Sequence, residues 1–323
     1  MDISVVLSTY NRCDTLAKAL GKLSQQEAPG IQYEIIVVDN NSTDRTPEIA
    51  EGFTAADARF RYLFEARQGL SYGRNAGIRA ARADAIVFTD DDVEVATDWI
   101  RRIHQALLRY PEAEYIGGRV LPLLEEPKPA WAHFKMSPFA LQDLGDEPVR
   151  IGDPDRRCLI GACLAVRRRA LAKAGLFSIE TQRVQDGVGS TEDADWETQV
   201  WNYGGHGMYV PEIVVHSPLS KSRLLKAYHR RWHAGHGKFN ARARRPELES
   251  ARRWLDVPAF IYRQALQSGF ECALLSLQRK PVQAFERENA LLFSLGFIAE
   301  RWRMQLLSPQ SARRQAQVNS LAS

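Results

Sequence analysis

Three consecutive aspartates, Asp90, Asp91 and Asp92, follow the apolar run 85–89. Adjacent carboxylates repel one another, which raises their pKa values and costs stability unless a cation lies among them. Oxygen ligands of this kind suit Mg²⁺ or Mn²⁺, which keep coordination positions open for phosphate oxygens. We therefore expect a divalent cation at this triplet. The alternative is a solvated turn that caps the following helix.

A second carboxylate pair, Glu192 and Asp193, lies in the run TEDADW at the start of a predicted helix with an apolar face. Acidic residues are favoured at helix N-termini by the helix dipole, and this is the structural alternative. A carboxylate in this position can also take the proton of an attacking hydroxyl as a general base. We expect Asp193 to have that role.

His216 follows the apolar run 213–215 and can give a nitrogen ligand to the same metal. A surface or core histidine is the alternative.

A glycine-spaced segment also begins a predicted helix, where backbone amides and an arginine can approach phosphates. Its members are Gly69, Gly73, Arg74, Asn75 and Gly77. It lacks the G-x-G-x-x-G dinucleotide fingerprint, and ordinary helix capping is the alternative.

The elements that must position these residues alternate short β-branched runs with helical periodicity, which is typical of a parallel sheet covered by helices. Ligands bind beyond the carboxyl ends of such strands. The residues after the first, second and fourth strands should therefore converge on one edge. Strands are predicted over 3–8, 33–38, 61–64, 85–89, 114–121, 158–167 and 208–215, with an irregular insertion over 122–155 and helices over 15–25, 46–53, 71–82, 98–109, 168–174 and 192–203.

Composition indicates a folded chain of 323 residues with 45% hydrophobic residues, enough for a sizeable core. Disorder and collagen-like repetition are excluded. Four scattered cysteines, without metal-binding or disulfide spacing, favour a reduced, cytoplasmic chain. We expect no export signal. The longest uncharged apolar stretch near the end, Asn289–Ala299, is far shorter than the roughly 18 residues of a membrane-spanning helix.

Charge is unevenly distributed along the chain, because residues 217–323 contain 19 Lys and Arg but only 7 Asp and Glu. The overall charge of +4 does not argue for nucleic acid. The run YHRRWHAGHGK, residues 228–238, is interpreted as a flexible basic loop over a diphosphate, with a solvated helix junction as the alternative. The amphipathic helices beyond residue 257 can lie on an anionic membrane surface, pack within the protein, or pair two subunits as a homodimer.

Over residues 2–217 the chain resembles glycosyltransferase family 2, with a GT-A fold. The matching pieces, in order, are SVVLSTYNR, EIIVVDNNSTD, the segment from Gly69 to Gly77, FTDDD, GACLAVRR and TEDADW. The resemblance implies an α/β catalytic domain over 1–220, with a nucleotide-binding half (1–95) and an acceptor half (96–220). A basic helical extension over 221–308 and a polar tail over 309–323 would follow.

The resemblance also implies site roles. Asp193 is expected as the catalytic base with Glu192 beside it, and Asp92 as the likelier direct metal ligand, with Asp90 and His216 as further ligands. The residues expected to bind the nucleotide-sugar are Thr9, Tyr10, Arg12, Asp39, Asn41, Gly69, Arg74, Asn75, Asp90 and Asp91, with Asp39 on the base and Asp90 or Asp91 near the ribose.

We thus predict a metal-dependent inverting glycosyltransferase that uses Mn²⁺ or Mg²⁺ and a nucleotide-sugar, with UDP preferred and GDP and dTDP open. Its acceptor would be a saccharide or lipid-linked saccharide in glycan or polysaccharide synthesis. The expected location is cytoplasmic, with peripheral attachment to the inner face of the cytoplasmic membrane open. The alternatives are a non-catalytic GT-A scaffold, a carbohydrate-binding protein or a sugar nucleotidyltransferase.

Overall fold

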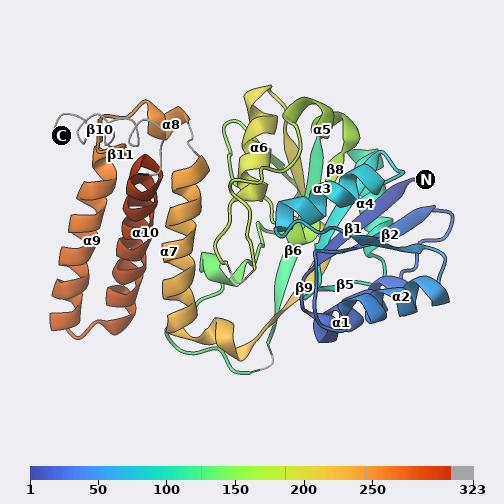
Figure 1. The fold of residues 1–323 in the computed structure, drawn as a ribbon, viewed down its shortest axis with the longest axis horizontal. Helices are drawn as coiled ribbons and strands as arrows, with labels where there is room; N and C mark the ends of the chain where they lie inside the picture. The colour runs from blue at the N-terminus through green and yellow to red at the C-terminus, as the bar shows by residue number, and fades with distance from the viewer. Residues whose placement is uncertain (125, 186, 244–245, 307–323) are drawn as a thin grey trace, which may run out of the picture. The chain divides into compact units, whose positions relative to one another are not determined.

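The computed structural model describes residues 1–124, 126–185, 187–243 and 246–306. Figure 1 shows its helices and strands. The strands are β1 (Ile3–Thr9), β2 (Tyr33–Asp39), β3 (Phe60–Phe64), β4 (Ala85–Asp90), β5 (Glu94–Val95), β6 (Tyr115–Leu124), β7 (Val149–Ile151), β8 (Leu164–Arg167), β9 (Gly207–Leu219), β10 (Arg253–Trp254) and β11 (Val257–Pro258). The helices are α1 (Cys13–Ser24), α2 (Thr46–Ala56), α3 (Leu70–Ala80), α4 (Trp99–Arg109), α5 (Arg168–Ala174), α6 (Glu192–Asn202), α7 (Lys226–Ala243), α8 (Pro246–Glu249), α9 (Ala259–Leu277) and α10 (Pro281–Leu306), with short 3₁₀ turns at Ser137–Phe139, Gly161–Cys163 and Lys221–Leu224.

A nine-stranded sheet has the order β3-β2-β1-β4-β8-β6-β9-β5, and β7 pairs with β9. The strands β1 to β4 run parallel to one another, whereas β8 is antiparallel to both β4 and β6. The predicted α/β class with a mostly parallel sheet is confirmed. Because β1, β2 and β4 are parallel neighbours, their carboxyl ends lie at one edge, as expected.

Successive side chains of a strand point to opposite faces of the sheet, so neighbouring residues of β1 pack against different helices. Val5 and Leu7 of β1 pack in a core with α1, α2 and α4. Val6, between them, packs in a second core with α3, α5 and α6. Strands buried on both faces explain why the sequence shows continuous apolar runs rather than alternation.

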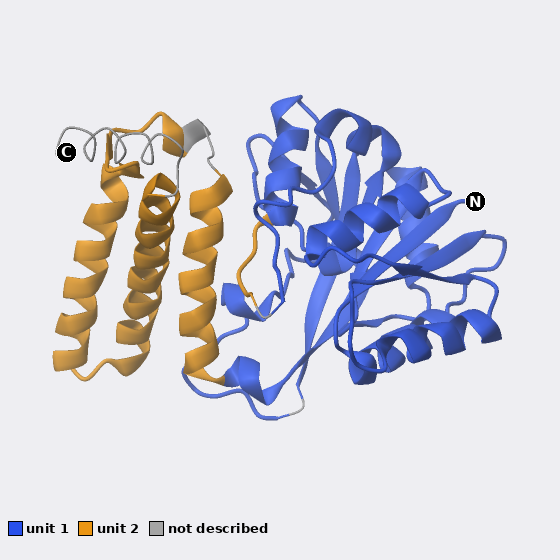
Figure 2. Ribbon diagram, viewed as in Figure 1, with its two compact units in different colours: residues 1–186, 192–224 blue, residues 187–191, 225–323 orange. Residues whose placement is uncertain are grey.

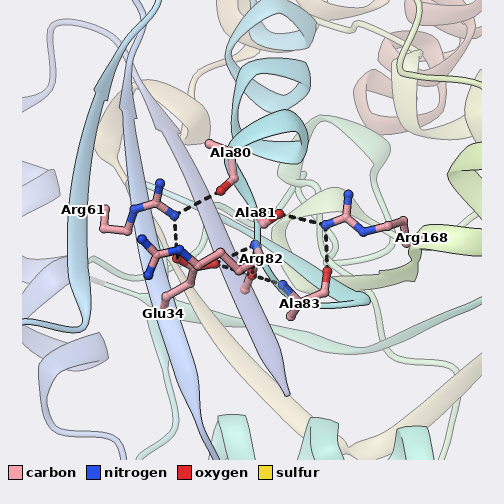
Figure 3. A network of polar contacts seen from close by, with 8 residues as sticks. Glu34, Arg61, Ala80, Ala81, Arg82, Ala83 and Arg168 are labelled. Carbon is pink, nitrogen blue, oxygen red and sulfur yellow. Dashed lines mark hydrogen bonds and ion pairs between the residues drawn. The ribbon is translucent and has the colours of Figure 1, made fainter. Parts of the chain in front are cut away.

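A polar network stabilises the amino-terminal ends of the strands, opposite the carboxyl ends that carry the expected site. Figure 3 shows this network from close by. Glu34, almost fully buried, accepts hydrogen bonds from Arg61 at 2.6 Å and from the amide of Arg82 at 2.8 Å. Arg61 also donates to the carbonyl of Ala80, the last residue of α3, and Arg168 donates to the carbonyls of Ala81 and Ala83 just beyond it. This network fixes the C-terminal end of α3, whose other end reaches the site.

Two predicted segments differ in detail. The strand predicted over 158–167 begins only at Leu164, after the 3₁₀ turn Gly161–Cys163, because residues 158–160 bind side chains instead of a neighbouring strand. The insertion predicted over 122–155 contains β7 and the end of β6.

The chain divides into two compact units (Figure 2). The first contains residues 1–186 and 192–224. The second contains Gly187–Thr191 and the residues from 225 onward. The domain limits predicted at 220 and 308 stay predictions, and the tail over 309–323 lies outside the described residues.

The second unit is helical and has its own core. The helix α10 packs against both α7 and α9, and Ile261, Phe297 and Ile298 are buried between them. The predicted helical extension is thus confirmed, and packing within the extension accounts for part of its apolar residues. No helix among the described residues has the length and apolarity that crossing a membrane requires.

The prediction of a flexible loop over residues 228–238 is wrong, because these residues lie inside the continuous helix α7. The glycines that suggested flexibility allow close approach instead. A Cβ atom at Gly237 would clash with the backbone of α10 at Phe293, and one at Gly235 would clash with the carbonyl of Val188.

Candidate active site

The carboxyl ends of β1, β2 and β4 surround an open, polar hollow. Six of the expected nucleotide-binding residues line it: Thr9, Tyr10, Arg12, Gly69, Asp90 and Asp91. The other lining residues are Ser8, Asn40, Gln68, Leu70, Arg183 and Gln185. The first unit therefore places a polar cavity where the strand order predicts a ligand.

Asp91 is the most deeply held carboxylate of the aspartate triplet. It accepts a hydrogen bond from Thr9 Oγ1 at 2.7 Å and pairs with Arg12 Nη1 at 3.0 Å. Arg12 Nη1 also lies 2.7 Å from Asp92 Oδ2. Burial raises the pKa of Asp91 to about 6, although Arg12 opposes the shift. Arg12 thus partly neutralises two of the three carboxylates.

The donor chemistry of the triplet fits Mg²⁺ or Mn²⁺, since it consists of carboxylate oxygens beside an open hollow. In the described part of the chain, no three His, Cys, Asp or Glu side chains are grouped closely enough to hold a metal by themselves. His216 of β9 lies opposite Glu94 of β5 in the antiparallel register of the two strands, and it is half-buried. A Mg²⁺-type site needs only one or two protein carboxylates when phosphate oxygens and water complete it.

Arg74, almost fully buried in α3, connects the aspartate triplet to the second acidic pair. Its guanidinium pairs with Asp193 Oδ1, lies 3.5 Å from Glu192 Oε1 and lies 3.7 Å from Asp90 Oδ1. Burial lowers the pKa of Arg74, but these carboxylates outweigh it and raise the pKa above its ordinary value. The guanidinium is also within cation–π range of the rings of Phe88 and Phe177.

Asp193 lies in the first turn of α6, and both of its carboxylate oxygens are engaged. Oδ1 pairs with Arg74, and Oδ2 accepts the amide hydrogen of Gly161 at 3.0 Å. The space is narrow, because a Cβ atom at Gly161 would lie 2.6 Å from Asp193 Oδ2. The structure therefore brings the expected base and Asp90 together through one arginine.

The start of α3 is capped from within the protein. Gln182 Oε1 accepts the amide hydrogens of Ser71 at 3.0 Å and Tyr72 at 3.3 Å, and Asn40 Oδ1 accepts that of Gly69 at 2.7 Å. Ordinary helix capping, the alternative to phosphate binding, therefore describes the start of α3. The backbone amides that were expected to face phosphate already have acceptors within the protein. Asn75 exchanges two hydrogen bonds with the backbone of Phe177.

Two other expected nucleotide contacts lie outside the lining of the hollow. Asp39 is fully buried, and its oxygens accept from Tyr62 Oη at 2.9 Å and from the amide of Ser42 at 2.9 Å. Asn41 has a left-handed backbone, with φ of 66°, in the exposed turn after β2. Their roles at the nucleotide base stay predictions.

Gln182, Arg183 and Gln185 show what sequence patterns miss. They come from the irregular run TQRVQD, which has neither periodicity nor a strand end to point to a site. The backbone carbonyl of Arg183 accepts the amide hydrogen of Leu70 at 2.9 Å, so this loop is fixed to the start of α3. Arg183 thereby adds a cation to the hollow.

The family model described as Glycosyl transferase family 2 matches residues 4–175. Glycosyltransferase AglE from Haloferax volcanii is 36% identical over 119 residues, which are 36% of this chain and 39% of that protein. The matched part therefore spans well under half of this relative.

Solved structures share the fold at lower identity. The mannosyltransferase PcManGT from Pyrobaculum calidifontis, solved with GDP-Man and Mn²⁺, aligns with a TM-score of 0.55 and 17% identity, over 99% of this chain and 80% of that chain. TarS 1-349 from S. aureus, solved with UDP-GlcNAc, aligns with a TM-score of 0.56 and 13% identity, over 93% and 92%. These similarities confirm the expected GT-A architecture.

Proposed function

The chain belongs to glycosyltransferase family 2, and from this membership we propose that it is a metal-dependent inverting transferase. It moves a sugar from a nucleoside diphosphate donor to a hydroxyl of a saccharide or lipid-linked saccharide, in glycan or polysaccharide synthesis. UDP is our first candidate nucleotide, with GDP and dTDP as alternatives. The observation that carries the proposal is the position of Arg74 between Asp90 and Asp193.

The reaction is a single displacement at the anomeric carbon. The acceptor oxygen forms the new bond to that carbon while the bond to the diphosphate oxygen breaks, and the nucleoside diphosphate leaves with the bonding electrons. Asp193 takes the acceptor proton. Arg74 and the Gly161 amide hold the Asp193 carboxylate in place, and attack from the opposite face inverts the anomeric configuration.

Asp92 and Asp90, with His216 as the third expected ligand, would hold Mg²⁺ or Mn²⁺. When bound, such a cation neutralises charge on the departing diphosphate. Arg12, Thr9 and Asp91 form the polar wall of the hollow. Arg12 and Arg183 add positive charge where a diphosphate would lie.

A donor panel tests the proposal. Nucleotide release and thermal unfolding are measured with UDP, GDP and dTDP and their sugars, each with Mn²⁺ or Mg²⁺. We expect one nucleotide with metal to raise Tm and its sugar to support transfer. If no nucleotide with metal stabilises the protein, the donor site is wrong. If nucleotide binds with metal but no sugar is transferred from any donor, a non-catalytic scaffold is the better description.

The two acidic groups have separable roles. Asp92→Ala should abolish metal-dependent nucleotide binding. Asp193→Ala should leave that binding within about twofold and remove transfer by about 10²-fold or more, as expected for loss of a general base. Calorimetric binding and a transfer assay on both variants measure this. Equal loss of binding in both would contradict the assignment.

For the second unit we propose an anionic lipid surface as partner. Leu266, Phe270 and Leu277 of α9 are 77%, 70% and 83% exposed. The single acidic residue of α9, Glu271, is paired with Arg287 at 3.0 Å. Exposed Arg263, Arg279 and Lys280 lie on or just beyond this helix. An apolar stripe with cations around it suits anionic lipid headgroups better than a second copy of the same basic unit.

Vesicle sedimentation tests this surface. Binding to vesicles with anionic lipid, weak binding to neutral vesicles and loss of binding in Phe270→Ser are expected. Ala299→Ser, an exposed small residue on α10, is the control. Equal binding of the wild type and Phe270→Ser would overturn the proposal, as would a stable dimer in solution that Phe270→Ser dissociates.

A further inference from the structure

Glu197 is a fully buried carboxyl group that the proposed reaction does not use. It lies in α6 one helical turn after Asp193, on the same face of the helix. Both of its oxygens accept the amide hydrogen of Leu159, at 3.0 and 3.1 Å. The Tyr115 side chain is a further polar neighbour, which opposes the effect of burial on the pKa of Glu197.

Two carboxyl groups of α6 therefore bind two amides of one strap, which we define as residues 158–161. Asp193 binds the amide of Gly161, and Glu197 binds that of Leu159. The spacings match, because four helical residues advance about 6 Å and alternate residues of an extended chain are about 6.6 Å apart. The strap is thus in register with α6.

A second buried side chain, that of Gln142, hydrogen-bonds to the other side of the strap. Gln142 Nε2 donates to the carbonyl of Cys158 at 2.8 Å, and Gln142 Oε1 accepts the amide hydrogen of Ile160 at 3.2 Å. The amides of residues 159 and 161 therefore point toward α6, while that of residue 160 points away. This alternation is what an extended strap between two supports requires.

We propose that Glu197 is a positioning residue for the transfer reaction: by fixing the strap in register with α6, it keeps the Gly161 amide on Asp193 and so orients the base toward the acceptor. The inference rests on the proposed function. Burial raises the pKa of Glu197 well above that of an ordinary glutamate, which favours the neutral acid.

Matched substitutions separate positioning from folding. Glu197→Gln keeps an acceptor for the Leu159 amide and should retain kcat within about threefold. Glu197→Met has similar length but no such acceptor, and should lower kcat about tenfold or more, with the donor KM within about twofold. Trp201→Phe is the control, because it removes the 2.8 Å hydrogen bond to Tyr115 in the same buried region without touching the strap. It should lower Tm and leave kcat unchanged.

Amide hydrogen exchange supplies a readout independent of activity. Exchange over 158–163 should accelerate in Glu197→Met and not in Glu197→Gln or Trp201→Phe. Accelerated exchange with normal kcat in Glu197→Met would overturn the positioning role while leaving the proposed function intact. A wild type that transfers no sugar would instead count against the proposed function.

If Glu197→Met does not fold, Gln142→Met loosens the strap from its other side. It should lower kcat at least about threefold at unchanged donor KM. Faster exchange over 158–163 in Gln142→Met, with unchanged kcat, would then overturn the inference.

Discussion

At the scale of single residues, Arg74 joins three carboxylates from two distant parts of the sequence at its guanidinium. Removing one partner of a buried ion pair leaves uncompensated charge and is strongly destabilising. A planar guanidinium reaches several carboxylates at once, which a lysine ammonium cannot do in the same way. The position is therefore sensitive even to a change that conserves charge.

Arg74→Lys should lower the free energy of unfolding by about 2 kcal/mol or more and reduce kcat. Arg101→Lys is the control, because Arg101 pairs with Asp98 at 2.9 Å on the surface, where such pairs contribute below about 1 kcal/mol. Chemical denaturation and a transfer assay measure both effects. Equal stability of the two variants would show that the Arg74 cluster is not coupled to folding.

The sequence identified the acidic residues but not their partners. Asp90 and Asp91 follow from their position after a strand, whereas Asp193 follows from the TEDADW motif at the start of a predicted helix. Gln182, Gln142 and Glu197 bind backbone amides brought near only by the fold, and a lone Glu or Gln has no sequence signal for such a contact. Arg74 was expected at phosphate, whereas its nearest charged partners in the structure are carboxylates.

At the scale of elements, helix contacts explain the glycines of the second unit. Gly237 of α7 and Gly296 of α10 each lie where a Cβ atom would clash with the backbone of the other helix. Gly269 of α9 has only the Leu291 methyl groups near, at 3.9 Å. Composition alone cannot distinguish glycine for close approach from glycine for flexibility, which is why residues 228–238 were expected to form a loop.

Gly237→Ala should destabilise the second unit by about 1–3 kcal/mol through overpacking. Gly269→Ala should stabilise it by about 0.5–1 kcal/mol, because alanine favours the helix and the space is sufficient. Thermal unfolding of the two variants gives the comparison. The same sign of change in both would contradict the packing of α7 against α10.

Acid should weaken α7 through His233. Burial and the neighbouring His236 and His229 lower the pKa of His233 to about 4. Between about pH 6.5 and 4 the unfolded chain binds a proton there that the folded chain does not, so stability falls as the pH falls. His233→Gln should recover about 1 kcal/mol at pH 5 relative to pH 7.5, allowing for partial solvent exposure. If the free energy of unfolding changed with pH in the same way in the variant and the wild type, His233 would not be the group that makes the protein sensitive to acid.

For the whole molecule, the sequence predicted the α/β sheet and the helical extension from periodicity and charge. It did not predict that Gly187–Thr191, between two parts of the first unit, joins the second. The reason is that His236 Nδ1 lies 2.9 Å from the carbonyl of Gly189 and Gly235 packs against Val188. These contacts join residues about fifty positions apart.

Ligand binding should protect the two units unequally. With UDP and Mn²⁺, amide exchange should slow at the ends of β1 and β4 and at residues 183–185, while α10 stays unchanged, because stabilisation follows the state that binds. Exchange mass spectrometry with and without nucleotide measures this. Uniform slowing across both units would show that they open together.

The pairing of Arg12 with Asp91 and Asp92 has a practical consequence for handling the protein. Those side chains are partly charge-balanced by a residue of the same chain, so folding need not depend on an added ion. Purification in a chelator should therefore leave Tm within about 1 °C of that in buffer alone, whereas Arg12→Ala should make the fold sensitive to chelation. A melting curve in each buffer would show whether the arginine substitutes for the ion in this way.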